Sequence, residues 1–419
     1  MPDILSDIIA QSRAGTPVAI PSVCSAHPEV LAASLRLAET LDRAIVIEAT
    51  SNQVNQEGGY TGMRPADFIA HVHALADVTG TDRARLVFGG DHLGPQAWRK
   101  LPAEEAMARA HVMVADYAAA GFTKIHLDCS EGCAGEPAQL SDAVTVPRAA
   151  ALARTATAAT KDPLFVVGTE VPPPGGARHD EGADIPPTTP ANARATLDAH
   201  MAAFTDIGRI GGLVVQPGVE FSPMAVHHLP LARDPGLLQA IAHHKGVVLE
   251  AHSTDYQRPA AYPRLAQLGF AFQKVGPALT FAWREAVYAL DWLAHAAGWG
   301  APLVQPAMER LMLDEPGYWQ GHYHGGDLAL QRHFGLADRI RYYWPRPVAQ
   351  EALAALRDRL AGRTLPAPLL WQAFGQDVLD RAEAIPGDRM TALAAAKVQA
   401  ALAPYFFTPP EPLVDEVRP

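Results

Sequence analysis

The chain has 419 residues, of which 48% are hydrophobic and 19% charged, a composition that excludes a largely disordered protein. Lysine and arginine total 34 against 45 for aspartate and glutamate, and this formal net charge of −11 argues against a nucleic-acid binder or a membrane-surface anchor. No apolar run approaches the roughly 18 residues of a membrane span, and the first residues lack a basic and then apolar leader. Cys24, Cys129 and Cys133 have no framework of spacings and are predicted to be free thiols, so we expect a cytoplasmic protein.

Eight short apolar runs recur along the first 280 residues, and amphipathic, Ala-rich segments lie between them. The predicted strands are residues 18–22, 44–48, 85–89, 124–128, 164–169, 211–216, 246–251 and 270–275. The predicted helices between them are residues 28–41, 65–78, 103–120, 146–159, 191–205 and 237–244. This alternation predicts an α/β fold with right-handed crossovers, and eight units predict a (β/α)8 TIM barrel. An open doubly wound sheet is the rival, but polar residues follow the whole set of runs and do not gather at one switch point.

Beyond about residue 300 the sequence changes to helical segments rich in aromatic residues and arginine, with no strand pattern. We therefore predict that residues 1–290 form the barrel that carries the site. Residues 291–419 are predicted to form a helical C-terminal extension that covers the barrel or assembles partners. The proline-rich, acidic tail at 407–419 is predicted to be loosely packed.

Two histidines follow predicted strands at the end where barrel enzymes carry their sites. Asp91 and His92 come directly after a Gly-Gly pair that would let a ligand approach the backbone, and His252 follows the seventh run. Each histidine alone is more often a hydrogen-bonded loop residue, but their joint placement predicts a metal pair. Adjacent Asp and His residues point to different sides of an extended chain, so we expect one to bind metal and the other to face substrate.

Carboxylates occupy equivalent positions after other strands, where an unpaired charge is costly and a metal or polar substrate offsets it. Glu170 and Glu220 are predicted metal ligands, and Glu131 is a predicted proton shuttle. Glu48 and Asp128 also follow strands and belong to the same set of acids.

Several polar residues are candidates for substrate binding. Asn52 and Gln53 follow the second strand, and amides suit sugar hydroxyls, although a plain loop explains this segment equally well. Ser253 follows His252, and the backbone amides from Gly276 onward would hold a phosphate at a helix N-terminus. Lys274 is predicted to bind substrate; its rival role is a Schiff base, which the His and Glu set disfavours.

Long motifs connect these positions to a known family. They are residues 22–27 (SVCSAH), 47–62 (IEATSNQVNQEGGYTG), 89–95 (GGDHLGP), 216–221 (QPGVEF), 251–257 (AHSTDYQ), 274–281 (KVGPALTF) and 338–345 (DRIRYYWP). Over nearly its full length the chain resembles the GatZ/KbaZ Z-type subunits of D-tagatose-1,6-bisphosphate aldolase, and more distantly the class II, zinc-dependent ketose-bisphosphate aldolases.

The resemblance implies Asp91 as acid/base, His92 and His252 as metal ligands, and Glu170 as a metal carboxylate. It implies a divalent metal, zinc before manganese, nickel or cobalt. The aldolases carry a metal histidine near the end of strand six, where this chain has Val219 and Glu220, so Glu220 is the expected substitute.

Two functions follow from the resemblance. One is a metal-dependent 4-epimerase of D-tagatose 6-phosphate or the free ketoses; the other is a non-catalytic subunit that stabilises a Y-type aldolase chain, with a homo-oligomer left open. The segment from Asp128 to Glu131 is similar to an Asp-x-Ser-Glu motif of one aldolase branch and favours an independent catalyst. The C4 hydrogen of a 2-ketose is not acidic, so inversion there calls for retro-aldol cleavage of C3–C4. In that scheme Asp91 and Glu131 share the proton transfers.

Overall fold

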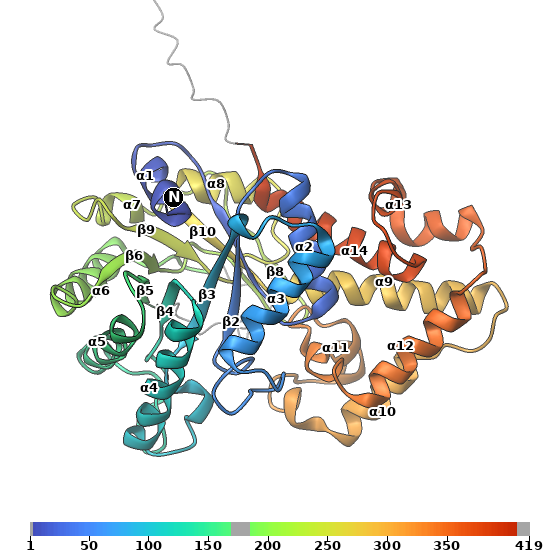
Figure 1. Cartoon of the computed structure of the whole chain (residues 1–419), viewed down its shortest axis with the longest axis horizontal. Helices are drawn as coiled ribbons and strands as arrows, with labels where there is room; N and C mark the ends of the chain where they lie inside the picture. The colour runs from blue at the N-terminus through green and yellow to red at the C-terminus, as the bar shows by residue number, and fades with distance from the viewer. Residues whose placement is uncertain (1–2, 169–184, 409–419) are drawn as a thin grey trace, which may run out of the picture.

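The computed structural model describes residues 3–168 and 185–408. Eight parallel strands close into a barrel in the order β1-β10-β9-β6-β5-β4-β3-β2 (Figure 1). The strands are β1 (Ile20–Cys24), β2 (Ile45–Thr50), β3 (Leu86–Leu93), β4 (Lys124–Leu127), β5 (Leu164–Gly168), β6 (Arg209–Val214), β9 (Val248–Ala251) and β10 (Phe270–Val275). Because β1 pairs with both β2 and β10, the sheet has no edge there, which confirms the TIM barrel and excludes the open sheet.

Helices connect these strands around the outside of the barrel. They are α2 (Pro28–Thr40), α3 (Pro65–Thr79), α4 (Ala103–Ala120), α5 (Asp142–Ala159), α6 (Pro190–Ala203), α7 (Leu237–Ala240), α8 (Ala261–Gln267) and α9 (Pro277–Ala296). Proline occupies the first turn of α2, α3, α6 and α9, where its missing N–H costs nothing. Gly80 and Gly121 end α3 and α4 in the left-handed conformation.

One local prediction was wrong, and one local element was not predicted. The helix predicted at 237–244 ends at Ala240, because the chain then turns, with the amides of Ala242 and His244 bonding three residues back. A hairpin of β7 (Glu220–Phe221) and β8 (Val226–His227) follows β6, and strands of two residues leave no periodicity for a sequence to show.

Helix α1 (Ile4–Arg13) closes the end of the barrel opposite the strand C-termini, since it packs on β9 and β10. Its Leu5 and Ile9 join an apolar cluster of inward side chains that includes Val46, Val166 and Phe272. This end of the barrel interior is therefore a packed apolar core.

The middle of the barrel is charged. Lys124 is fully buried and lies 2.7 Å from a carboxylate oxygen of Glu48 and 2.6 Å from one of Glu250. A Cβ at Gly89 would lie 2.7 Å from Cγ of Glu48. The Gly-Gly pair was expected to admit a ligand; its first glycine instead makes room for the Glu48 side chain, which points into the barrel.

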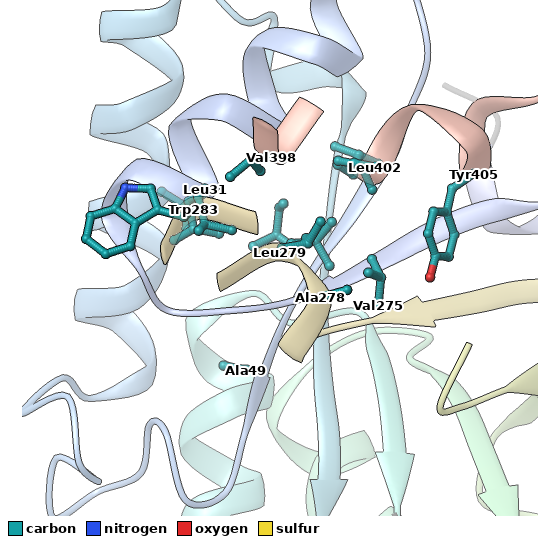
Figure 2. Packing of buried hydrophobic residues seen from close by; sticks show 14 of the residues in the cluster. Leu31, Ala49, Val275, Ala278, Leu279, Trp283, Val398, Leu402 and Tyr405 are labelled. Carbon is teal, nitrogen blue, oxygen red and sulfur yellow. The ribbon is translucent and has the colours of Figure 1, made fainter. Parts of the chain in front are cut away.

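The C-terminal helices lie on one side of the barrel (Figure 1). They are α10 (Val304–Asp314), α11 (Leu328–Phe334), α12 (Pro347–Leu360), α13 (Ala367–Glu383) and α14 (Arg389–Leu402). Helix α14 returns to pack on α2 and α9, and Figure 2 shows Val398 of α14 near Leu31 and Trp283, with Leu402 farther along toward Tyr405. The boundary predicted at residue 290 falls inside α9. No described helix is long and apolar enough to cross a membrane.

Candidate metal and sugar site

Three histidines and an aspartate meet at the C-terminal ends of the strands. They are Asp91 and His92 of β3, His126 of β4 and His252 directly after β9. Each offers a ligand atom within 4.8 Å of the others, and all four residues are buried. The imidazole centroids lie 4.7 to 5.2 Å apart.

Asp91 and His92 reach the same group although they are adjacent in the chain. His92 has φ of +47°, so the strand is not extended at this residue. The register between β3 and β4 also shifts between Gly90 and Leu93. The expectation that these two side chains point to different sides was therefore wrong, because the irregular backbone turns both toward the barrel axis.

Hydrogen bonds orient the rings of His92 and His126. Nδ1 of His92 lies 2.8 Å from Oδ2 of Asp128 and donates to this carboxylate, which leaves the lone pair on Nε2. Nε2 of His126 lies 3.1 Å from the carbonyl oxygen of Gly168, which only accepts, so the proton is on Nε2 and the lone pair on Nδ1. Nδ1 of His126 in turn lies 3.1 Å from Oδ1 of Asp91.

The third ring is oriented from inside the barrel. Nε2 of His252 lies 2.9 Å from Oε1 of Glu250, and the other carboxylate oxygen of Glu250 meets Lys124. Donation from Nε2 to this carboxylate puts the lone pair of His252 on Nδ1. Three imidazoles and one carboxylate form a donor set that fits a divalent transition metal, and a second hydrogen bond orients each imidazole.

The charges of the group differ between its members. Burial lowers the pKa of His92, but Asp91 and Asp128 outweigh it and raise this pKa above its ordinary value. Burial raises the pKa of Asp91, but the neighbouring His92 and Lys274 outweigh it and hold the pKa well below its usual range. Burial and the nearby Lys274 lower the pKa of His252 well below its ordinary value, which keeps that ring neutral. An ionised aspartate and a neutral imidazole are the forms that bind a metal.

Lys274 of β10 contacts Oδ1 of Asp91 and lies 3.5 Å from Oε2 of Glu48. Burial alone would lower the pKa of Lys274, but the two carboxylates raise it above its usual value. A Schiff base needs the neutral amine, so the surroundings of this lysine favour a charged partner of Asp91 over a covalent nucleophile.

Glu220 lies in the β7–β8 hairpin and not on a barrel strand, and it is not among the four grouped residues. Its Oε1 accepts the amide of Phe221, and Ser253 hydrogen-bonds to its side chain. Burial raises the pKa of Glu220 to about 7. His126 belongs to the grouped residues and Glu220 does not, and the role of Glu220 as a metal ligand stays a prediction. Glu170 lies outside the described residues.

Glu131, the predicted proton shuttle, lines a small pocket together with Asp128, Pro95 and Gln96. Its carboxylate accepts hydrogen bonds from Gln96 at 2.8 Å and from Arg99 at 2.5 Å. Glu131 therefore lies beside Asp128, which orients His92. Both carboxylate oxygens of Glu131 already accept hydrogen bonds, and its role as a proton shuttle stays a prediction.

The predicted substrate-binding residues divide into two sets. Gln53 is buried beside Cys24, whose thiol lies 3.5 Å from Oδ2 of Asp91. Gln53 therefore lies next to the four candidate metal ligands, which we call the metal group. Ser253 is buried next to His252, with φ of +51°. Asn52 is exposed on the loop after β2.

The amides predicted to hold a phosphate at the start of α9 have another partner. Oδ1 of Asp255 accepts the amide of Gly276 at 3.0 Å and that of Ala278 at 2.8 Å. A carboxylate of the chain itself therefore occupies the place where these amides would meet a phosphate.

His126 was not predicted. It lies inside the apolar run KIHLD, and the prediction concentrated on residues that follow strands. The signal was the alternation of Lys124, His126 and Asp128, which places all three on one face of a strand.

A second group of potential metal ligands, Asp198, His243 and His244, lies elsewhere. Oδ1 of Asp198 is 2.9 Å from Nε2 of His243 and 2.8 Å from that of His244. Both histidines precede β9, so this group is at the end of the barrel opposite the strand C-termini.

Residues 5–408 match the sequence model of a protein family, the D-tagatose-1,6-bisphosphate aldolase subunit GatZ/KbaZ-like family. The chain belongs to this family. It is 47% identical over 424 residues to a D-tagatose 6-phosphate 4-epimerase of Agrobacterium fabrum (strain C58 / ATCC 33970), covering 97% of this chain and 98% of the relative. A crystal structure of a probable tagatose 6 phosphate kinase from Sinorhizobium meliloti 1021 is 43% identical, covers 93% of this chain and 99% of that one, and superposes with a TM-score of 0.83. The GatZ/KbaZ-like resemblance and the barrel are thereby confirmed.

Proposed function

We propose that this protein is a D-tagatose 6-phosphate 4-epimerase, an isomerase that interconverts D-tagatose 6-phosphate and D-fructose 6-phosphate. The observation that carries the proposal is the group of Asp91, His92, His126 and His252 in a member of a family with an epimerase relative 47% identical over nearly the full chain. Both relatives carry tagatose 6-phosphate in their names.

The reaction we propose is retro-aldol cleavage of C3–C4 followed by re-addition to the opposite face of the aldehyde. Asp91 accepts the proton of the C4 hydroxyl as the bond breaks, and Lys274 beside it stabilises the carboxylate form. Glu131, which lines a small pocket with Asp128, shares these proton transfers with Asp91 in the proposed scheme. One proton leaves the C4 oxygen and one returns to it after re-addition, so atoms balance and no redox partner is needed.

A divalent metal would be held by His92, His126 and His252, with Asp91 beside them. Glu170 and Glu220 are further candidate metal ligands. When bound, it supplies Lewis-acid stabilisation of the negative charge that develops on the C2 oxygen of the substrate. Zinc is our first choice for this histidine-rich set.

The test is turnover of D-tagatose 6-phosphate by the purified chain alone, before and after a chelator and after return of zinc, manganese, nickel or cobalt. We expect D-fructose 6-phosphate to form and the chelator to abolish its formation. Absence of turnover with every metal would instead favour a non-catalytic partner of a Y-type aldolase subunit. Turnover that a chelator leaves unchanged would exclude the metal site.

Isotope transfer tests the chemistry independently. Retro-aldol cleavage never breaks the C4–H bond, so product formed in heavy water should carry no deuterium at C4. Deuterium at C4 in the recovered fructose 6-phosphate would show that the reaction proceeds by deprotonation of that carbon.

A further inference from the structure

Arg341 belongs to the motif DRIRYYWP of the C-terminal extension and lies in the 3₁₀ helix η4 (Arg339–Tyr343). Its guanidinium donates to Tyr342 Oη at 2.8 Å and to the carbonyl oxygens of Ala337 and Asp338. Among the described residues it forms no ion pair with a carboxylate. A half-buried arginine bonded only to neutral acceptors retains its positive charge for an anion.

A continuous path of side-chain contacts joins this arginine to the metal group. Asp91 contacts Cys24, and the Cys24 thiol lies 3.9 Å from Oε1 of Gln53. Gln53 hydrogen-bonds Tyr60, whose ring meets that of Tyr342 edge-on with centroids 4.9 Å apart.

Tyr342 completes this path, because it accepts a hydrogen bond from Arg341 and its ring lies 4.4 Å from the guanidinium carbon. The charge of Arg341 also acts on Tyr60, where it opposes the rise in pKa that burial causes. Arg341 therefore lies on the β1–β2 side of the strand C-termini.

The segment that carries Arg341 is fixed to the barrel. Oδ1 of Asp338 lies 2.9 Å from Nε of Arg284 in α9, and both side chains are buried. Tyr256, which follows β9, donates to the carbonyl oxygen of Leu336 at 2.6 Å. A cation held in this way needs little ordering when an anion binds.

Other candidates for holding a phosphate are engaged or exposed. The amides of Gly276 and Ala278 are bonded to Asp255. Arg64 is exposed at the start of α3, and Arg339 donates to the carbonyl oxygen of Tyr318.

We infer that Arg341 binds the phosphate of the ketose 6-phosphate and that the helical extension thereby selects the phosphorylated sugar over the free one. This inference rests on the proposed function and names the substrate class of that site. An arginine fork matches a phosphate, and one such charge-assisted bond is worth about 2 kcal/mol, a factor of about 30 in affinity.

The test compares wild type with Arg341→Gln on D-tagatose 6-phosphate and on free D-tagatose. We expect KM for the phosphorylated sugar to rise about 30-fold with kcat within about 3-fold, because a contact remote from C3–C4 contributes equally to ground and transition states. The kcat/KM on free tagatose should stay within about 2-fold. Arg341→Lys should restore part of the loss in affinity. The matched control Arg346→Gln, which breaks a surface pair with Glu315, should leave KM and kcat unchanged for both sugars.

Equal losses on both sugars would overturn the inference, because they would show that Arg341 only supports the fold. No loss on either sugar would also overturn it. Calorimetric binding of D-tagatose 6-phosphate and of inorganic phosphate separates this inference from the proposed function. Wild-type binding that Arg341→Gln weakens, without turnover, would uphold the phosphate site and reject the epimerase. If wild type binds neither probe, the phosphate site is rejected.

Discussion

At the scale of single residues, the site is built from side chains whose partners lie deeper in the barrel. His252 is bonded to Glu250, Glu250 to Lys124, and Lys124 to Glu48. Removing one member of such a buried set leaves an uncompensated charge, which costs about 3–5 kcal/mol. The orientation of His252 therefore depends on charged side chains deeper in the barrel.

His126 provides the sharpest residue-scale prediction. In His126→Ala we expect the affinity for metal to fall at least 10-fold and turnover to fall about 1,000-fold, since one of the grouped ligand atoms beside Asp91 is lost. Metal content after dialysis and kcat on D-tagatose 6-phosphate measure the two effects.

His111→Ala is the matched control, because His111 lies on α4 and bonds to Thr155, away from the strand ends. It should retain full metal and turnover. Full metal binding by His126→Ala would remove His126 from the ligand set.

Sequence alone predicted part of this group. Asp91, His92 and His252 follow or end strands and were found by position. His126 was missed because it lies inside an apolar run. Glu250 was missed because the local sequence does not show whether an acid inside a strand has a buried cationic partner or whether the segment is not a strand. The placement of Glu220 depends on a hairpin whose strands have two residues each, too short to show a periodicity in the sequence.

At the scale of elements, the strands were predicted to within a few residues, and β10 at its exact bounds, because barrel strands are buried on both faces and read as short apolar runs. The irregularities of β3 were not predictable. His92 with φ of +47° and the register shift beside it depend on contacts with β4, which the local sequence does not contain.

Gly89 on β3 tests how the element shapes the interior. We expect Gly89→Ala to destabilise the fold by about 1–3 kcal/mol and to reduce turnover, because the new Cβ would lie 2.7 Å from Cγ of Glu48 and displace its carboxylate from Lys124. Thermal unfolding and kcat measure both effects.

Gly246→Ala is the control, since nothing lies within 4 Å of its new Cβ and its φ is not in the left-handed region. It should leave both stability and turnover near wild type. If Gly89→Ala behaved the same way, the carboxylate of Glu48 would not need the space this glycine provides.

At the scale of the whole molecule, the extension and the barrel share one core. Trp283 of α9 packs edge-on against Trp344 with centroids 4.9 Å apart, and its Nε1 donates to Glu29 of α2 at 2.8 Å. Glu29 in turn pairs with Arg357 of α12. Segments from the start, middle and end of the chain therefore meet at one junction, which the change of pattern near residue 300 did not reveal.

His27 places a pH-sensitive group in this junction. Its ring packs against Trp283 in a tilted arrangement with centroids 4.3 Å apart, and burial lowers its pKa to about 4, against the raising effect of Asp338. The unfolded chain binds a proton near pH 6.5 and the folded chain does not until pH 4, so stability is lost as the pH falls through this interval. At about 1.4 kcal/mol per pKa unit, with a discount for partial exposure, the loss is on the order of 2 kcal/mol.

The variant His27→Phe keeps a ring on Trp283 and removes the titration. We expect its free energy of unfolding to fall less than that of wild type between pH 6.5 and pH 4, by roughly the same 2 kcal/mol. His228→Phe, which replaces an exposed histidine, should follow the wild-type pH dependence. Denaturant unfolding at several pH values decides the matter. Parallel curves for wild type and His27→Phe would mean that His27 takes up its proton equally in both states, and the acid sensitivity of the junction would then belong to its carboxylates.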